Sequence, residues 1–435
     1  MNFFSKTFFH ARVHLPYIIL LILGVAIIYW PVYKFNFLIG WDDQWLVTNR
    51  YTENGCKWDN LYEIWTAYYR GQYAPLNQMY YTTLYMVFGY SPPYFHIAAV
   101  LVHLCNVILI YFFLNTVTVR VTDKPVEKIR QISFLTAFLF AILPVNIESV
   151  AWVSASKVPI YALLYLASLL WYSKYAATRK SPYYYLTLIA FILSFAAKEQ
   201  AISLPVCLFL IDYAYRRSFR DRKVWLEKLP FFILALLFGI ITIYSQELEF
   251  REHSFYPLYQ RIPLAFYTLS EYFTKCLIPV NISYLYPFPF QMGEHTAWWL
   301  WIYVVIVPLI IYFLYDQIKI RWVLFGLLFF VIHILLVMNF FSIARFSVTA
   351  DRYAYLSSIG LCYIVSYIII NHLYQPKLQK PLLAACLLYI GLLLGYSCIH
   401  ITTWANAFTL KSKLRETIEQ RNDFNELKIG NDERK

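Results

Sequence analysis

Apolar and polar stretches alternate along the whole chain, with the spacing that a lipid bilayer sets. An apolar helix needs about 20 residues to cross the hydrocarbon core. The pattern predicts eleven membrane-spanning helices, at residues 16–36, 94–116, 131–146, 157–175, 183–197, 199–215, 229–246, 299–316, 322–340, 353–372 and 381–401. The two helices on either side of Lys198 are short. They could instead be half-deep helices that meet in a cavity lined by protein.

The composition places the chain among polytopic membrane proteins. Of its 435 residues, 60% are hydrophobic and only 14% are charged, and the mean hydropathy is +0.51. A soluble core could not hide this much apolar surface, so the pattern excludes a water-soluble protein. The first apolar segment is long and lacks a small-residue cleavage site, which indicates a span rather than a signal peptide. The seven scattered cysteines predict neither a metal knuckle nor a disulfide framework.

Basic residues gather in alternate loops and so predict the orientation of the chain. The loop at 216–228 holds six Lys and Arg residues, whereas the much longer segment 37–93 holds three. Cytoplasmic loops are enriched in Lys and Arg. The pattern therefore puts the N-terminus inside and, after eleven spans, the C-terminus outside. Two long segments, 37–93 and 247–298, then face the outer side.

Both outer segments contain stretches rich in aromatic residues, such as WDNLYEIWTAYY and AFYTLSEYFTKCL. Such stretches are typical of amphipathic helices that lie on the membrane surface. We therefore expect an all-α protein with one membrane domain over residues 1–401 and amphipathic outer-face helices in its first long loop. Residues 402–435 would form a short extracytoplasmic tail.

Polar residues recur at the predicted outer ends of the spans, where a charge is costly unless it is solvated, paired or used in chemistry. Four clusters share this placement: Asp42 and Asp43; Asn146, Glu148 and Lys157; Lys198 and Glu199; and Arg345, Asp351 and Arg352. Because all four fall on one side, they predict one shared cavity that is open to water.

Each cluster also has a structural interpretation. The adjacent acids of FNFLIGWDDQWLV could mark the membrane edge, and Glu148 could form a bridge with Lys157. Lys198 and Glu199 could pair with other neighbours, and Asp351 could cap the next helix. A transporter is a further alternative, but it would place charges near the midplane and show internal repeats. Sugar transfer from a polyprenyl phosphate fits the outer rim better, because the phosphate needs Lys or Arg and the acceptor hydroxyl needs a carboxylate base.

Six stretches, in order along the chain, resemble the motifs of a known family. They are WDDQWLVTN, GQYAPLNQMYYTTLYMVFGYSPPYFHIAAVLVHLCNVILIYFF, LPVNIESVAWVSASKVPIYALLYLASLLWY, AKEQAISLPVCLFLIDY, LIPVNISYLYPFP and ADRYAYLSSIGL. The family is that of the transmembrane O-mannosyltransferases that carry TPR repeats, with their bacterial relatives, within the GT-C class of glycosyltransferases. These enzymes use lipid-phosphate sugars as donors. The repeats are absent here, so no acceptor-binding role of the repeats is carried over.

The resemblance implies an inverting transfer on the outer face, in which an acid of the first outer loop is the base. This role maps onto Asp42 or Asp43. We favour Asp42, with Asp43 orienting the acceptor or a divalent cation, whose requirement stays open. The resemblance also implies phosphate contacts from Lys198, Arg345 and Arg352, and a substrate pocket of Tyr73, Glu148, Lys157, Glu199, Asp351 and Tyr353. Leu143 and Asn146 stand where the family has histidines, and Ser156 where it has arginine, so those roles do not carry over.

We therefore expect a monomeric, eleven-span GT-C glycosyltransferase of a bacterial inner membrane, with its site facing the periplasm. It would move one sugar, with mannose as the leading candidate, from a polyprenyl-phosphate carrier to an acceptor hydroxyl. That hydroxyl belongs to Ser or Thr of an exported protein or, alternatively, to a glycan or a lipid such as lipid A. A transporter or flippase of lipid-linked glycans and a catalytically dead scaffold are the rival interpretations. No nucleic-acid partner is expected.

Overall fold

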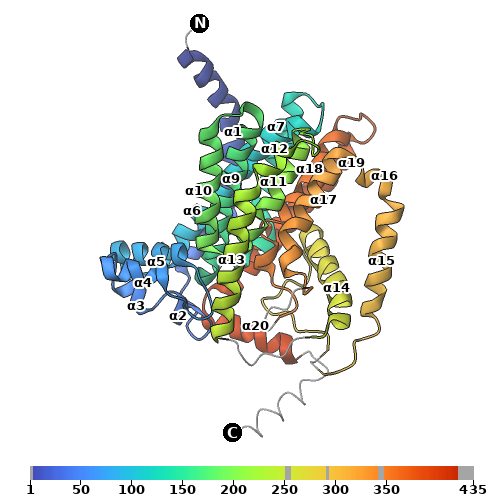
Figure 1. Ribbon diagram of the computed structural model, residues 1–435. Coiled ribbons are helices and arrows are strands. Elements are labelled where there is room, and N and C mark those ends of the chain that lie inside the picture. Colours follow the sequence, from blue (N-terminus) through green and yellow to red (C-terminus); the bar gives the residue numbers. More distant parts are fainter. Residues whose placement is uncertain (1–2, 250–255, 291–292, 341–346, 420–435) are drawn as a thin grey trace.

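The protein is a bundle of helices, shown in Figure 1 as a computed structural model. The structure describes residues 3–249, 256–290, 293–340 and 347–419. Within these ranges there is no strand, and extended pairing is confined to two isolated bridges, Tyr69 with Gln72 and Tyr286 with Thr349. The all-α class expected from the sequence is confirmed.

Several helices of the described ranges are long and apolar enough to cross a membrane. Five segments meet this condition, at Arg12–Lys34, Pro92–Val121, Val153–Thr178, Arg222–Gln246 and Gln379–Trp404. Their main helices are α1 (Phe3–Tyr29), α6 (Pro92–Val121), α9 (Lys157–Thr178), α13 (Leu229–Glu249) and α19 (Gln379–His400). A sixth span would be the bent pair of α7 (Val126–Ile142) and the segment Pro144–Ala151, with 57° between them.

Shorter apolar helices occupy the other expected segments. They are α10 (Ser181–Ala197), α11 (Leu204–Ala214), α15 (Leu300–Phe313), α17 (Arg321–Ile334) and α18 (Ser358–Leu373). Lys198 is in an extended conformation between α10 and η4 (Glu199–Ser203), which confirms that the two helices around it are short. At 1.5 Å per residue, α11 reaches only about 16 Å of a core about 30 Å thick. Length and composition thus support five or six spans, and the count of eleven stays a prediction.

The segment expected to be the first outer loop folds into four short helices beside the bundle. They are α2 (Asp43–Leu46), α3 (Arg50–Glu53), α4 (Trp58–Thr66) and α5 (Pro75–Phe88). In Figure 1, α4 and α5 lie across the long axis of the bundle. Trp58 and Tyr62 of α4 are 80% and 64% exposed, so this amphipathic helix presents aromatic side chains outward. The second amphipathic stretch lies in α14 (Leu258–Leu277).

Two glycines let α17 and α18 pack closely. A Cβ atom on Gly360 would clash with the carbonyl oxygen of Gly326. Small residues permit such an approach between membrane helices, and a larger side chain would separate the backbones. The contact lies in the first turn of α18, which begins four residues after the end of the turn η6 (Asp351–Ala354).

The start of the expected tail packs onto the membrane part. Trp404, at the end of η7 (Ile401–Trp404), is 1% exposed and stacks on Trp152 with ring centroids 5.7 Å apart. Leu410, in α20 (Ala407–Glu419), is fully buried. The remaining short elements are η1 (Trp30–Lys34), η2 (Pro144–Asn146), α8 (Ile147–Ala151), η3 (Val153–Ser156), α12 (Arg222–Leu226), α16 (Tyr315–Ile318) and η5 (Leu335–Val337).

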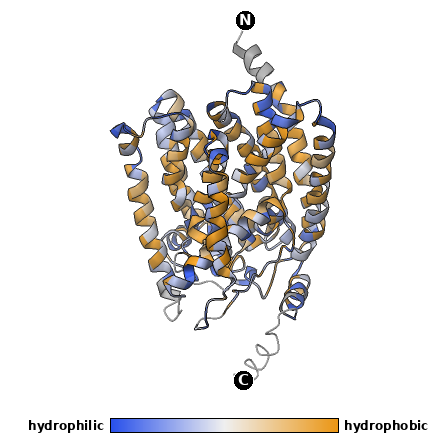
Figure 2. Ribbon diagram, turned by 90° about the vertical axis from the view of Figure 1, so that its right-hand side faces the viewer, coloured by the Kyte–Doolittle hydropathy of each residue, from blue (hydrophilic) through white to orange (hydrophobic). Residues whose placement is uncertain are grey.

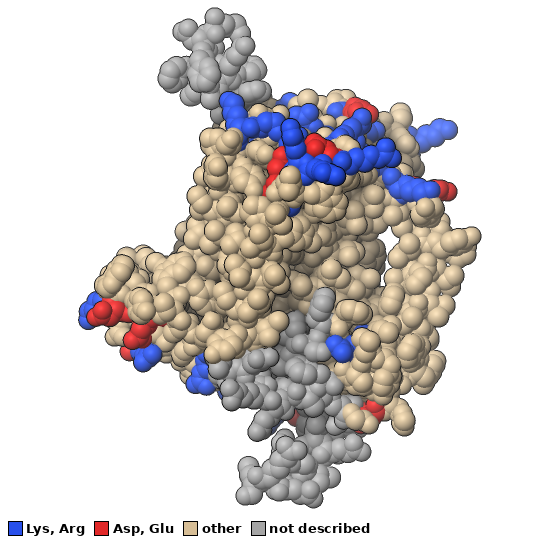
Figure 3. Space-filling model, viewed as in Figure 1, with Lys and Arg blue, Asp and Glu red and all other residues tan. Residues whose placement is uncertain are grey.

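The two ends of the bundle differ in charge. Hydrophobic residues dominate the middle of the helices, between more hydrophilic ends (Figure 2). On the face shown in Figure 3, Lys and Arg gather at the end where Figure 1 places α12. The N-terminal part of α1 lies at this end, whereas α2 and α20 lie toward the other (Figure 1). This polarity is the one that alternate basic loops produce in a membrane protein.

Candidate functional site

The two adjacent acids of the first outer loop have different surroundings. Asp43 is fully buried, and its carboxylate accepts hydrogen bonds from the backbone N–H of Leu38 (2.7 Å), the backbone N–H of Ser154 (3.1 Å) and the Ser154 hydroxyl. These bonds tie the loop to η3. Asp42 is only partly buried, and its carboxylate takes part in no ion pair of the described residues. Asp43 therefore holds the loop in place, and Asp42 is the acid of the pair that solvent can reach.

Burial raises the pKa of both carboxyl groups. For Asp42, loss of hydration raises the pKa from 3.8 to about 6, while Lys157 and Arg352 act in the opposite direction. Burial also raises the pKa of Asp43, against the hydrogen bonds from Ser154 and Leu38. A carboxylate with a pKa near 6 is mostly ionised at pH 7 and still accepts a proton more readily than an ordinary aspartate, as a general base requires.

A proline bend after α7 brings Glu148 to the site. Pro144 opens η2, and α8 then carries Glu148, whose side chain is 2% exposed. The carboxylate accepts from the backbone N–H of Arg352 (2.8 Å) and from its guanidinium. That guanidinium also lies 5.5 Å from the Trp152 ring centroid and 5.0 Å from that of Tyr353. Glu148 thus pairs with Arg352, and the interpretation of a bridge from Glu148 to Lys157 is wrong.

The break between α10 and α11 adds a second ion pair. Lys198 is 3% exposed, and its ammonium group lies 3.2 Å from Glu199 Oε1, so these two residues pair with each other. The Lys198 ammonium also lies 5.5 Å from the Tyr353 ring centroid. The charged groups of Lys198 and Arg352 therefore both lie close to the Tyr353 ring.

Lys157, the first residue of α9, is the cation of the cluster without a carboxylate partner. It donates to the Gln72 side-chain oxygen at 2.6 Å, and no ion pair involves it within the described ranges. Lys157 lies within electrostatic range of Lys198, Arg352 and Asp42. Like charges held together cost energy unless an anion lies near them. The structure thus brings together, from four separate segments, the unpaired carboxylate of Asp42 and three cations.

Asp351 faces a second group of residues. No side chain caps η6, and α18 begins only at Ser358, so Asp351 does not cap the next helix. Its Oδ1 accepts instead from the Tyr286 hydroxyl (2.8 Å). Burial raises the pKa of Asp351 to about 7, with Lys275 lowering it and Glu148 raising it. A carboxyl group with this pKa is protonated in about half of the molecules near pH 7.

Sequence reasoning missed Lys275. Its ammonium group donates to Thr349 Oγ1 (3.1 Å) and lies 3.2 Å from the centre of the Tyr286 ring, beside Asp351. Lys275 is 5% exposed and follows Thr268 and Tyr272 on the buried face of α14. A lysine in phase with the apolar stripe of an amphipathic helix was the signal that could have found it.

The remaining expected site residues have other surroundings. The Tyr73 hydroxyl donates to the carbonyl oxygen of Trp65 (3.1 Å), and its ring lies 6.2 Å from that of Phe195, so Tyr73 borders the cluster through its neighbour Gln72. Arg345 lies outside the described residues.

The three residues that depart from the family motifs support the fold. Leu143 is 1% exposed in the core. The Asn146 side-chain NH2 donates to the Phe140 carbonyl oxygen (2.8 Å), and Ser156 Oγ lies 2.9 Å from the Tyr81 hydroxyl. Asn146 thus binds the backbone at the end of α7, and Ser156 contacts a side chain of α5.

The residues that the structure describes hold no group of three or more His, Cys, Asp or Glu side chains that could bind a metal ion. No protein-family model matches this chain, and no curated protein matches it.

Proposed function

We propose that the protein is an eleven-span membrane glycosyltransferase of the GT-C type. It moves one sugar, mannose in the leading case, from a polyprenyl phosphate to an acceptor hydroxyl on the outer face of the membrane. The observation that supports this proposal best is the partly exposed, unpaired carboxylate of Asp42 beside the cations Lys157 and Arg352. A base for the acceptor and cations for the phosphate are the groups that such a transfer requires.

The proposed transfer is a displacement at the anomeric carbon of the sugar. The acceptor oxygen attacks the anomeric carbon as its proton passes to Asp42. The bond from that carbon to the phosphate oxygen breaks, and the phosphate leaves with the electron pair. Phosphate needs little help from an acid when cations offset its charge. Lys157, which has no carboxylate partner, is the best placed of the three cations to do so, and this moves it from the substrate pocket to the phosphate site.

Arg352 and Lys198 have a different part in this mechanism, because Glu148 and Glu199 already offset their charges. A guanidinium has five N–H donors, so Arg352 can hold Glu148 and still donate to a phosphate oxygen. The lipid tail would stay in the bilayer beside the apolar helices. The basic opposite end of the bundle supports an outer, periplasmic position of the site.

The test is transfer by the purified protein in nanodiscs with radiolabelled polyprenyl-phosphate mannose, and with octyl mannoside or a Ser/Thr-rich peptide as acceptor. Wild-type protein should release polyprenyl phosphate and label an acceptor. Asp42→Asn should lose at least about a hundredfold in turnover, since a positioned base contributes about 10²–10⁴-fold. The matched control is Asp59→Asn, which changes an exposed acid of the same loop and should leave turnover unchanged.

Two results would contradict the proposal. Equal turnover in the Asp42 and Asp59 variants would leave the acid pair as a structural feature of the membrane edge. Movement of intact donor between leaflets without release of polyprenyl phosphate would identify a flippase.

A further inference from the structure

The first outer loop contains a pocket that the transfer mechanism does not use. It is lined by Leu46, Tyr51, Glu63, Ile64, Ala67, Tyr69, Gln72, Ala74, Pro75, Asn77 and Gln78, and its atom-free space, including the part open to solvent, is about 470 Å³. All of these residues come from one short stretch of chain, so the pocket is built by α2–α5 and their connections alone.

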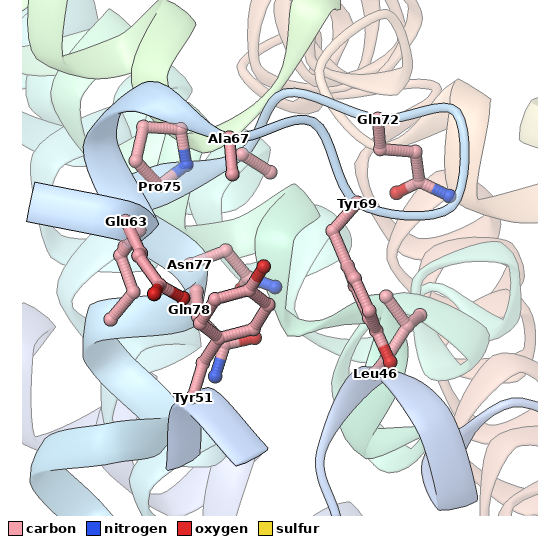
Figure 4. Close-up of a pocket in the computed structure, with 11 residues that line it drawn as sticks. Leu46, Tyr51, Glu63, Ala67, Tyr69, Gln72, Pro75, Asn77 and Gln78 are labelled. Atoms are coloured by element: carbon pink, nitrogen blue, oxygen red, sulfur yellow. The ribbon is translucent and has the colours of Figure 1, made fainter. Parts of the chain in front are cut away.

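Aromatic rings form the sides of the pocket. The rings of Tyr51 and Tyr69 lie 5.4 Å apart at 86°, and Trp45 lies 6.5 Å from Tyr69. In Figure 4, Tyr51 and the amides of Asn77 and Gln78 lie on one side, and Tyr69 lies on the other. Aromatic faces are negative and attract the slightly positive C–H groups of a sugar ring, while they repel an anion.

Besides the tyrosine hydroxyls and Glu63, the polar side chains of the pocket are amides, and one amide oxygen lacks a hydrogen-bond partner among the described residues. Gln78 is held by Asn49 (3.2 Å) and Thr52 (2.8 Å). Asn77 is 3% exposed, and its side-chain oxygen has no hydrogen-bond partner among the described residues. A buried acceptor without a partner is costly, and a ligand hydroxyl would supply the missing donor. The one charged lining residue, Glu63, is paired with Arg50 at 3.3 Å.

The pocket adjoins the proposed site of transfer. Leu46 ends α2, which begins directly after Asp42, and Gln72 accepts the hydrogen bond of Lys157. We propose that this pocket binds a neutral sugar ring of the acceptor, so that the acceptor hydroxyl belongs to a glycan. This inference rests on the proposed function and names its acceptor class. Amide hydrogen bonds select the hydroxyls, and the aromatic rings contact the face of the sugar.

Direct binding tests the pocket without the reaction. Saturation-transfer NMR would be recorded on the protein in nanodiscs without donor, with methyl glycosides of mannose, glucose, galactose and N-acetylglucosamine. At least one glycoside should receive saturation from the wild-type protein. Asn77→Ala and Tyr69→Ala should strongly reduce the signal at the same glycoside concentration. Asn54→Ala and Tyr62→Ala, which change exposed residues of the same loop outside the pocket, should keep it.

Transfer kinetics supply the second readout. With the bound glycoside as acceptor, Asn77→Ala and Tyr69→Ala should raise the acceptor KM about tenfold and leave kcat unchanged. Release of polyprenyl phosphate in the absence of acceptor should also be unchanged. Tyr69 is only partly buried, so its variant remains informative if the Asn77 variant unfolds.

The outcomes separate the two proposals. Binding that depends on Asn77, in a protein that never cleaves the donor, would retain the sugar pocket and overturn the proposed function. Donor cleavage without pocket-dependent binding of any glycoside would overturn the sugar pocket. Saturation of a Ser/Thr-rich peptide that is lost in the Asn77 and Tyr69 variants would also overturn it, because the pocket would then hold a protein acceptor.

Discussion

Replacing each of the two adjacent acids by asparagine should change stability in opposite directions. In native Asp42, burial raises the pKa from 3.8 to about 6. At about 1.36 kcal/mol per pKa unit, keeping Asp42 ionised above pH 6 costs up to about 3 kcal/mol relative to the unfolded chain. Because the side chain is partly exposed, solvent screening reduces this to about 1–2 kcal/mol. Asp42→Asn removes the charge and should stabilise the protein by about that amount at pH 7.5.

The same calculation gives the pH dependence. The pKa of Asp42 is raised in the folded state, so the native protein binds this proton more tightly than the unfolded chain does. The penalty is absent below pH 3.8, grows between pH 3.8 and 6, and is complete above pH 6. The stabilisation by Asp42→Asn should therefore decrease from pH 7.5 to pH 4.5. Wild-type kcat/KM should fall below pH 6, because Asp42 is then protonated and cannot act as the base.

Asp43→Asn should destabilise the protein. Three donors, from Leu38 and Ser154, converge on this buried carboxylate. An amide keeps one oxygen but turns its NH2 group toward a donor, which leaves a buried N–H without a partner. Losing a charge-assisted hydrogen bond and leaving a donor unsatisfied should cost about 2–4 kcal/mol.

The assay is thermal unfolding in detergent, followed by tryptophan fluorescence at pH 4.5 and 7.5. Asp59→Asn serves as the control, because its acid is exposed. A higher midpoint for Asp42→Asn and a lower one for Asp43→Asn at pH 7.5 would support the reasoning. If Asp42→Asn destabilised the protein as much as Asp43→Asn, the assignment of one free and one structural acid would be refuted.

Three further predictions concern the rest of the molecule. Arg352→Ala should weaken donor binding by about 1.5–3 kcal/mol and destabilise the fold, because it leaves Glu148 buried and unpaired. Arg352→Lys should recover part of both losses, which titration with donor and thermal unfolding would measure. Unchanged donor affinity in the Ala variant would exclude a phosphate contact. Leu410→Asp should cost about 3 kcal/mol or more because the side chain is fully buried, and an unchanged unfolding midpoint would show that α20 does not pack as described. Reporter fusions at Arg222 and Lys411 should lie on opposite sides of the membrane, and two cytoplasmic signals would contradict an odd number of spans.

The sequence by itself was enough to determine the class of the protein and the places of its helices. The length and apolarity of a spanning helix are set locally by the bilayer, so each of the eleven expected segments coincides with a helix or a helix pair. The break at Lys198 was predictable for the same reason, and so was the helix over WDNLYEIWT, the first nine residues of the stretch WDNLYEIWTAYY. Charges at one end of the spans also indicated that Asp42, Lys157 and Arg352 would come together.

The pairing of residues within the cluster depends on how the helices pack in space. Glu148 meets Arg352 across 204 positions of the chain, and no local pattern distinguishes this partner from Lys157, which is much nearer in sequence. The same holds for Asp43, whose hydrogen bonds to Ser154 separate its role from that of Asp42. The position of Lys275 beside Asp351 depends on the packing of α14. An ion pair depends on distance in space, whereas hydropathy depends on neighbours along the chain. The sequence could therefore predict the helices and the membership of the cluster, and the fold assigned the contacts within it.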